Sequence, residues 1–240
     1  LAFRGRSKKN IAKLLCFGIA AALPVVPVSL YNSLLAGKPV FVQANSGFNF
    51  FLGNNPDSTG SCYIRPGQEW DKVHNKASEV SKTEGITQDA FFMRESLSFF
   101  KEHPVKAALN FVKKAVMTWN FREFCAGADM DYFRYFTPFQ RMGKFAFAIL
   151  GIAALAGLLV AISRRETLFE YRHFLMLAFS FWFVQTLFVT SGRYRSPMLP
   201  AIFALAAFFI AYVISEKKTL ANAVRLLLPA ALAALVVFFP

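Results

Sequence analysis

The stretch Ser191-Gly192-Arg193-Tyr194-Arg195-Ser196-Pro197 lies between two apolar runs, residues 174–190 and 198–214. Each run approaches the roughly 20 residues that a helix needs to cross a bilayer. The stretch therefore predicts a short turn between two membrane spans. Arg193 and Arg195 are costly at the edge of a membrane, where charges commonly mark a bound ion, a phosphate or a pore.

The composition is typical of a membrane protein. Hydrophobic residues make up 55% of the chain and charged residues only 17%, which is unusual for a soluble domain of 240 residues. The chain begins with Leu1 and ends with Pro240 directly after an apolar run, so we expect it to be part of a longer protein. Five runs are expected to span the membrane: residues 11–31, 142–163, 173–190, 197–214 and 226–239.

The distribution of basic residues predicts the topology. With residues 1–10 in the cytoplasm, the cytoplasmic segments hold eleven basic and three acidic residues, a net charge of +8. The long section 32–141 holds thirteen basic and eleven acidic residues and is then extracytoplasmic. Most of the formal charge of +13 therefore follows from topology, and nucleic acid is not an expected partner. We expect a multi-pass protein of the plasma (inner) membrane.

The section 32–141 is predicted to be a mixed α/β subdomain. Residues 40–42 and 48–51 have the pattern of short strands, and the turn signals around Gly53 and Pro56 favour a loop between elements. Helices are predicted over residues 69–82, 87–103 and 104–119. The fold class is thus an all-α polytopic membrane protein with a small extracytoplasmic mixed subdomain. The predicted division is 1–31, a basic end and first span; 32–141, the loop subdomain; and 142–240, a four-span bundle.

The helix predicted after Pro104 is amphipathic. Its apolar residues recur at helical spacing, and its lysines fall on the flanks or on the opposite face. Two interpretations are open. The helix lies in the membrane interface, or it is a core helix of a small soluble subdomain. The apolar residues are Val105, Ala108, Leu109, Val112, Val116 and Trp119.

The topology places Arg193 and Arg195 on the side of the membrane where arginine is usually avoided. A guanidinium presents a planar set of donors that matches phosphate oxygens. A lipid-linked phosphate at the outer face is therefore the expected ligand. The alternative is that both side chains anchor the protein to lipid headgroups.

Three segments together resemble the GT-C glycosyltransferases of bacteria that are related to dolichyl-phosphate-mannose:protein mannosyltransferases. The first is residues 45–56, Asn-Ser-Gly-Phe-Asn-Phe-Phe-Leu-Gly-Asn-Asn-Pro, followed by Gly60. The second is the preceding helix with Pro24 and Pro27, and the third is the Arg-Tyr-Arg turn at residues 193–195. The helix that Pro104 opens also fits, so the resemblance covers most of residues 11–215.

The resemblance implies a membrane enzyme that transfers a sugar from a polyprenyl-phosphate donor on the extracytoplasmic face, with inversion. The acceptor is a glycan, a lipid or a protein, and membrane lipid is the other partner. The catalytic acidic residue of such enzymes lies in an earlier loop that is not in this sequence, so no catalytic residue is assigned. Arg193 and Arg195 match the basic turn of the family and are expected at the donor phosphate, with Tyr194 orienting the turn.

The resemblance also brings four asparagines to the site. Asn45, Asn49, Asn54 and Asn55 would shape the loop or face the sugar. For Asn54 and Asn55 the sequence favours turn chemistry, because asparagine tolerates left-handed backbone and bonds to its own chain.

Other motifs carry less weight. Asp129-Met130-Asp131 resembles a metal-binding acidic pair but has no nucleotide-binding fold around it, and the three histidines have no ligand spacing, so no metal or cofactor is expected. Cys62 and Cys125 are a candidate disulfide pair if their loop faces an oxidising compartment, and the sequence leaves their pairing open. Two other functions remain open: a transporter or flippase for a lipid-linked sugar, and a non-enzymatic receptor or assembly module.

Overall fold

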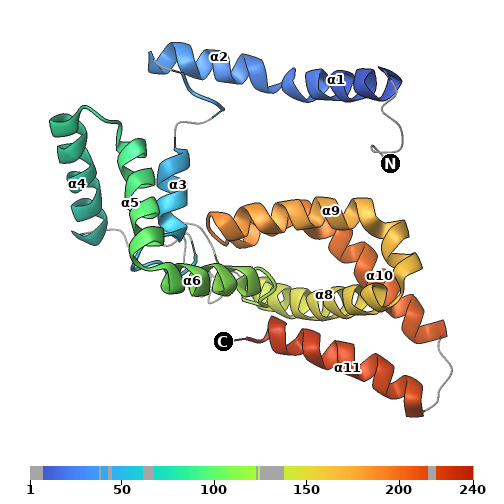
Figure 1. Ribbon diagram of the computed structural model, residues 1–240. Helices are drawn as coiled ribbons and strands as arrows, with labels where there is room; N and C mark the ends of the chain where they lie inside the picture. Colours follow the sequence, from blue (N-terminus) through green and yellow to red (C-terminus); the bar gives the residue numbers. More distant parts are fainter. Residues whose placement is uncertain are drawn as a thin grey trace. The chain divides into compact units, whose positions relative to one another are not determined.

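The computed structural model describes residues 8–37, 39–42, 45–61, 68–122, 124, 138–215 and 220–239. Within these ranges the regular elements are helices, and the only β contact is an isolated parallel bridge between Ser61 and Thr190 (Figure 1). The chain divides into two compact units, residues 1–46 and 47–240. The candidate cysteine pair Cys62 and Cys125 and the Asp129-Met130-Asp131 motif lie outside the described residues.

The first unit holds α1 (Lys8–Ala22) and α2 (Val25–Ala36). The two helices are bent by 43° at the break around Pro24. Proline ends or kinks a helix here because it lacks the N–H that the preceding turn requires. The bend in this run therefore follows from Pro24.

Residues 40–42 are not a strand, so the prediction of one there is wrong. They turn back along α2, where the backbone N–H of Val40 donates to Ser33 Oγ at 2.8 Å and that of Val42 to Ser29 Oγ at 3.2 Å. These backbone N–H groups, which a strand would donate to a neighbouring strand, donate instead to serine hydroxyl oxygens of α2.

The prediction of a strand at residues 48–51 is also wrong, because they lie within α3 (Ser46–Gly53). A short apolar run has no periodicity that separates strand from helix. A contact with α5 (Gln88–Glu102) favours the helix here, because the Asp89 carboxylate accepts the backbone N–H of Phe48 at 3.0 Å. Asp89 thereby satisfies one of the unpaired donors at the start of α3.

The helices predicted in the long section are confirmed, with small shifts in their ends. They are α4 (Gln68–Glu84), α5 (Gln88–Glu102) and α6 (Pro104–Met117). Gly85 follows α4 with a φ of +68°, and Pro104 opens α6 at its first turn. Phe91, Phe92 and Ala77 form a buried core between α4 and α5, against which Phe48 and Phe51 of α3 pack. The subdomain is helical in its described residues rather than mixed α/β.

Replacing Thr87 with alanine is expected to loosen the start of α5. The Thr87 hydroxyl accepts the N–H of Ala90, and losing such a cap costs about 1 kcal/mol. Hydrogen exchange at the first-turn amides of α5 should become about fivefold faster. Thr83→Ala is the matched control, because Thr83 only bonds back to carbonyls of its own helix. Equal exchange rates in both variants would exclude a capping role.

The remaining helices of the second unit are apolar. They are α8 (Pro138–Ser163), α9 (Arg165–Leu187), the 3₁₀-helix η1 (Gly192–Met198), α10 (Leu199–Ser215) and α11 (Leu220–Val237). A core of Ala154, Met198, Ile202, Leu205 and Ala206 joins α8 to η1 and α10. A Cβ on Gly157 would lie 2.3 Å from the Leu205 carbonyl oxygen, so the α8 and α10 backbones approach closely. Small residues permit this approach in membrane helices.

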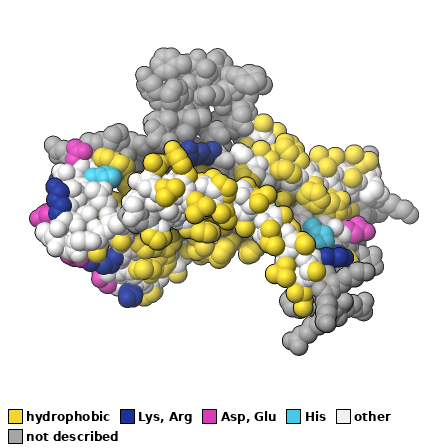
Figure 2. All heavy atoms as spheres, turned by 90° about the horizontal axis from the view of Figure 1, so that it is seen from above, with side chains coloured by type: hydrophobic (Ala, Val, Ile, Leu, Met, Phe, Trp, Pro, Cys, Tyr) yellow, Lys and Arg dark blue, Asp and Glu magenta, His cyan; other side chains and the backbone are white. Residues whose placement is uncertain are grey.

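Two described helices are long and apolar enough to cross a membrane, Phe145–Ser163 and Gly192–Ser215, or three if the bent α1–α2 pair is one span. Figure 2 shows hydrophobic side chains covering much of the described part of one face, with charged side chains in a few small groups. These findings support a membrane protein. The other two of the five predicted spans, in α9 and α11, do not meet this measure. Helix α9 begins with four charged residues among its first eight, and the apolar part of α11, Leu226–Val237, is short.

Candidate functional site around the arginine turn

Residues 191–198 connect α9 to α10 and are called the arginine turn. Within them, Gly192–Met198 forms the 3₁₀-helix η1. Ser191 precedes it in extended conformation, and the backbone N–H of Gly192 donates to the Phe124 carbonyl oxygen at 2.7 Å. Pro197 lies inside η1, and it has no N–H to donate to a carbonyl of the preceding turn. The turn is thus a short, well-packed element that directly continues into the candidate span Gly192–Ser215.

Arg195 is buried, with 5% of its surface exposed. Its Nη1 donates to the Asn120 carbonyl oxygen at 2.8 Å and its Nη2 to the Arg122 carbonyl oxygen at 3.2 Å. Its guanidinium carbon lies 4.1 Å from the centre of the Phe147 ring. These contacts compensate for the burial of the charge. They tie η1 to the segment after α6 and to α8.

Arg193 is exposed, although it precedes the buried Arg195 by only two residues. Its Nη2 donates to Tyr194 Oη at 2.9 Å, and the guanidinium lies 4.9 Å from the centre of the same ring. Tyr194 therefore orients the Arg193 side chain, while its expected role in orienting the whole turn stays a prediction. Of the two arginines predicted at a phosphate, Arg193 is the one that an anion reaches from solution.

Asn54 connects the loop after α3 to the end of α9. Its Nδ2 donates to the carbonyl oxygens of Phe50 and Leu187 at 2.9 and 2.8 Å, and its Oδ1 accepts from Lys114 Nζ at 2.8 Å. The predicted turn chemistry accounts only for the bond to Phe50, because Leu187 and Lys114 lie far away in the sequence.

Asn55 does show local turn chemistry. Its Oδ1 accepts the backbone N–H of Asp57 at 2.9 Å, and its Nδ2 donates to the Phe51 carbonyl oxygen at 2.7 Å. Asn49 is half-buried on α3, and Asn45 is exposed just before it. Among the described residues, Asn54 is thus the one of these four asparagines that bonds to the end of α9. A role for any of the four at a sugar stays a prediction.

Lys114 of α6 is fully buried. Its ammonium donates to Asn54 Oδ1 and to the carbonyl oxygens of Leu187 and Phe188, both at 3.1 Å. The last carbonyls of a helix have no partner within it, and they form the negative end of its dipole. Lys114 therefore caps the C-terminus of α9. Its burial lowers the pKa of the amine to about 8, because the charged form loses its hydration.

Helix α6 buries its polar face. Asn110 and Lys114 are buried, and Asn110 Nδ2 donates to the Gly53 carbonyl oxygen at 2.8 Å. The apolar residues Val105, Leu109 and Val112 are instead 72%, 65% and 57% exposed. A core helix of a soluble subdomain would bury this stripe. Its exposure in the described structure favours the interpretation that α6 lies in a membrane interface.

Lys114 and Asn110 were not identified as site residues from the sequence. The available signal was the recurrence of Asn110, Lys114 and Thr118 at intervals of four, which places three polar side chains on one helix face. Such a stripe is usually solvated, so the pattern alone does not indicate burial.

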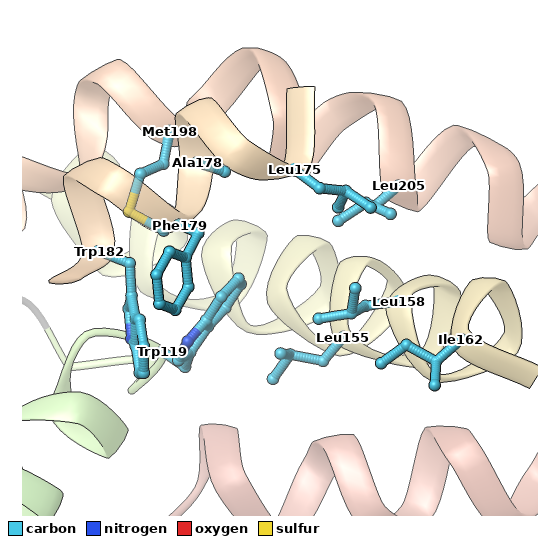
Figure 3. Close-up of a pocket in the computed structure, with 10 residues that line it drawn as sticks. All are labelled: Trp119, Leu155, Leu158, Ile162, Leu175, Ala178, Phe179, Trp182, Met198 and Leu205. Carbon is cyan, nitrogen blue, oxygen red and sulfur yellow. The ribbon is translucent and has the colours of Figure 1, made fainter. Parts of the chain in front are cut away.

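An apolar pocket of about 340 Å³ lies between α8, α9 and α10. Figure 3 shows Trp119, Phe179 and Trp182 gathered near Met198, with Leu155, Leu158 and Ile162 along α8. Met198 is the last residue of η1, so the pocket adjoins the arginine turn. A cavity of this size and lining accepts part of a hydrocarbon chain.

The chain was also compared with known proteins. No family model matches it, and no match was found among curated proteins or solved structures.

Proposed function

We propose that this chain belongs to an integral-membrane glycosyltransferase of the GT-C type, which transfers a sugar from a polyprenyl-phosphate donor on the extracytoplasmic face. The observation that carries the proposal is the exposed Arg193, oriented by Tyr194 on a turn that Arg195 anchors internally. The apolar pocket beside Met198 gives the polyprenyl chain a place next to that turn.

The chemical role of Arg193 would be electrostatic. When the sugar leaves for the acceptor, negative charge develops on the polyprenyl phosphate. A guanidinium already held at this position stabilises that charge without reorganising. No residue of this sequence is assigned as the general base, and Asn45, Asn49, Asn54 and Asn55 remain the residues proposed to face the sugar or shape its loop.

The experiment compares Arg193→Ala with Arg195→Ala in the full-length protein in membranes. Arg193→Ala should weaken binding of a polyprenyl phosphate at least about tenfold, because hydrogen bonds to a charged group contribute about 1.5–3 kcal/mol. Its melting temperature should stay that of the parent. Arg195→Ala should lower the melting temperature, because its loss leaves the carbonyls of Asn120 and Arg122 without this partner. Unchanged binding by Arg193→Ala would contradict the proposal.

A transporter of a lipid-linked sugar is the second candidate, and one observation favours it. Transporters commonly contain broken helices, and the α1–α2 pair is broken at Pro24. The two functions differ in chemistry. Release of polyprenyl phosphate from a labelled donor indicates transfer. Movement of an intact donor across the bilayer of sealed vesicles indicates transport.

A further inference from the structure

Helix α6 and the segment directly after it bond to the chain both before and after Arg193. Before the turn, Lys114 Nζ donates to the carbonyl oxygens of Leu187 and Phe188. Within the turn, Arg195 donates to the carbonyl oxygen of Asn120, six residues beyond Lys114. The chain that carries Arg193 is therefore held at both ends by one short piece of structure.

Three further bonds hold the end of α9 in place. Thr190 Oγ1 donates to the Lys114 carbonyl oxygen at 3.2 Å, and Trp182 Nε1 donates to the Ala115 carbonyl oxygen at 3.2 Å. Thr190 also donates its backbone N–H to the Gly60 carbonyl oxygen at 3.0 Å. The end of α9 thus lies in a fixed position against α6 and the loop after α3.

Lys114 is the charged member of this set. Each of its three ammonium donors has an acceptor, and no carboxylate is among the three. A buried cation without a counterion is costly, so it persists only where its geometry is well satisfied. A merely space-filling residue at this position would be apolar.

We infer that Lys114 is a positioning residue for Arg193: by capping α9 through Leu187 and Phe188, it sets where the arginine turn begins and so where the Arg193 guanidinium meets an anion. The anion itself rests on the proposed function, a phosphate group on a lipid. Lys114 does not touch that anion and acts only through the backbone that leads into η1.

The first test follows the turn without any ligand. A nitroxide label on Ser196→Cys, an exposed position in η1, reports the mobility of the turn in the full-length protein with Cys16, Cys62 and Cys125 replaced by serine. Lys114→Met should make this label more mobile, while a label on Lys82→Cys of α4 stays unchanged. Lys113→Met removes the exposed neighbouring lysine and should alter neither label. An unchanged Ser196 label in a folded Lys114→Met protein would overturn the inference, as would equal loosening at both labels.

A second variant guards against failure of Lys114→Met to fold. Asn54→Leu keeps the lysine but removes one of its acceptors and one donor to the Leu187 carbonyl. It should mobilise the Ser196 label to a smaller extent. If the label is as immobile as in the parent, the network around Lys114 does not hold the turn.

The second test is a double-mutant cycle on binding of a polyprenyl phosphate. Introduced alone into the parent, Lys114→Met should weaken binding of the polyprenyl phosphate about tenfold, which equals about 1.4 kcal/mol. It should add no further loss in the Arg193→Ala background, because a residue that acts through Arg193 has nothing left to position. Additive losses would contradict the inference. If the parent binds no polyprenyl phosphate, the proposed function fails, and the label experiment still decides the role of Lys114.

Discussion

Replacing Gly53 with alanine is expected to destabilise the folded second unit severely. A Cβ at this position would lie 1.6 Å from the Phe188 carbonyl oxygen, and that atom is backbone, which cannot move aside as a flexible side chain does. Separating α3 from the end of α9 would also break the bond from Asn54 to the Leu187 carbonyl oxygen. The cost should be on the order of 4 kcal/mol or more, at the upper end for single substitutions.

The measurement is unfolding of the full-length protein in detergent with rising denaturant. Gly151→Ala is the matched control, also a helical glycine in the second unit. A Cβ on Gly151 would meet its nearest atom, a methyl of Val237, at an ordinary 3.4 Å. That variant should match the parent or gain up to about 1 kcal/mol from the better helix propensity of alanine. Equal stability of the two variants would show that α3 does not pack against the end of α9 in this way.

The second large effect is a dependence of stability on pH that Lys114 causes. Its pKa is about 8 in the folded protein, against an ordinary value of 10.5. Below pH 8 the amine is charged in both states, and the folded state bears the full cost of burying it. Between about pH 8 and 10.5 the unfolded chain holds a proton that the folded chain lacks, so stability rises with pH. The rise should reach about 3 kcal/mol, since one pKa unit corresponds to 1.36 kcal/mol.

The quantity to measure is the difference in unfolding free energy between two variants, because that difference isolates the contribution of Lys114. Ionisable residues close in sequence to Lys114, or to the residues that it bonds, include Asp57, Lys113, Arg193, Tyr194 and Arg195. The unfolding free energy of the parent, minus that of Lys114→Met, should increase from pH 7.5 to pH 10. Lys113→Met should retain the rise of the parent. Parallel curves for the parent and Lys114→Met would show that Lys114 is not buried as a cation.

The helices of the long section could be predicted because their signals are local. Thr87 caps α5 through a residue three positions away, and Pro104 and Gly85 mark helix ends by their own backbone preferences. The apolar runs predicted spans for an equally direct reason, because length and hydropathy are properties of a segment. Residues 48–51 were misassigned because such a short run has no decisive periodicity, and a carboxylate about 40 residues away decides for helix.

The candidate site was only partly predictable. The sequence by itself determined that two arginines lie in one turn at the end of an apolar helix, and that α6 has an apolar stripe and a polar one. Only the tertiary structure decided that Arg195 is buried while Arg193 is exposed, and that the polar stripe of α6 faces inward. The physical reason is distance along the chain. The carbonyls that accept from Arg195 lie 75 and 73 residues away, and those that accept from Lys114 lie 73 and 74 residues away, so no local pattern contains both partners.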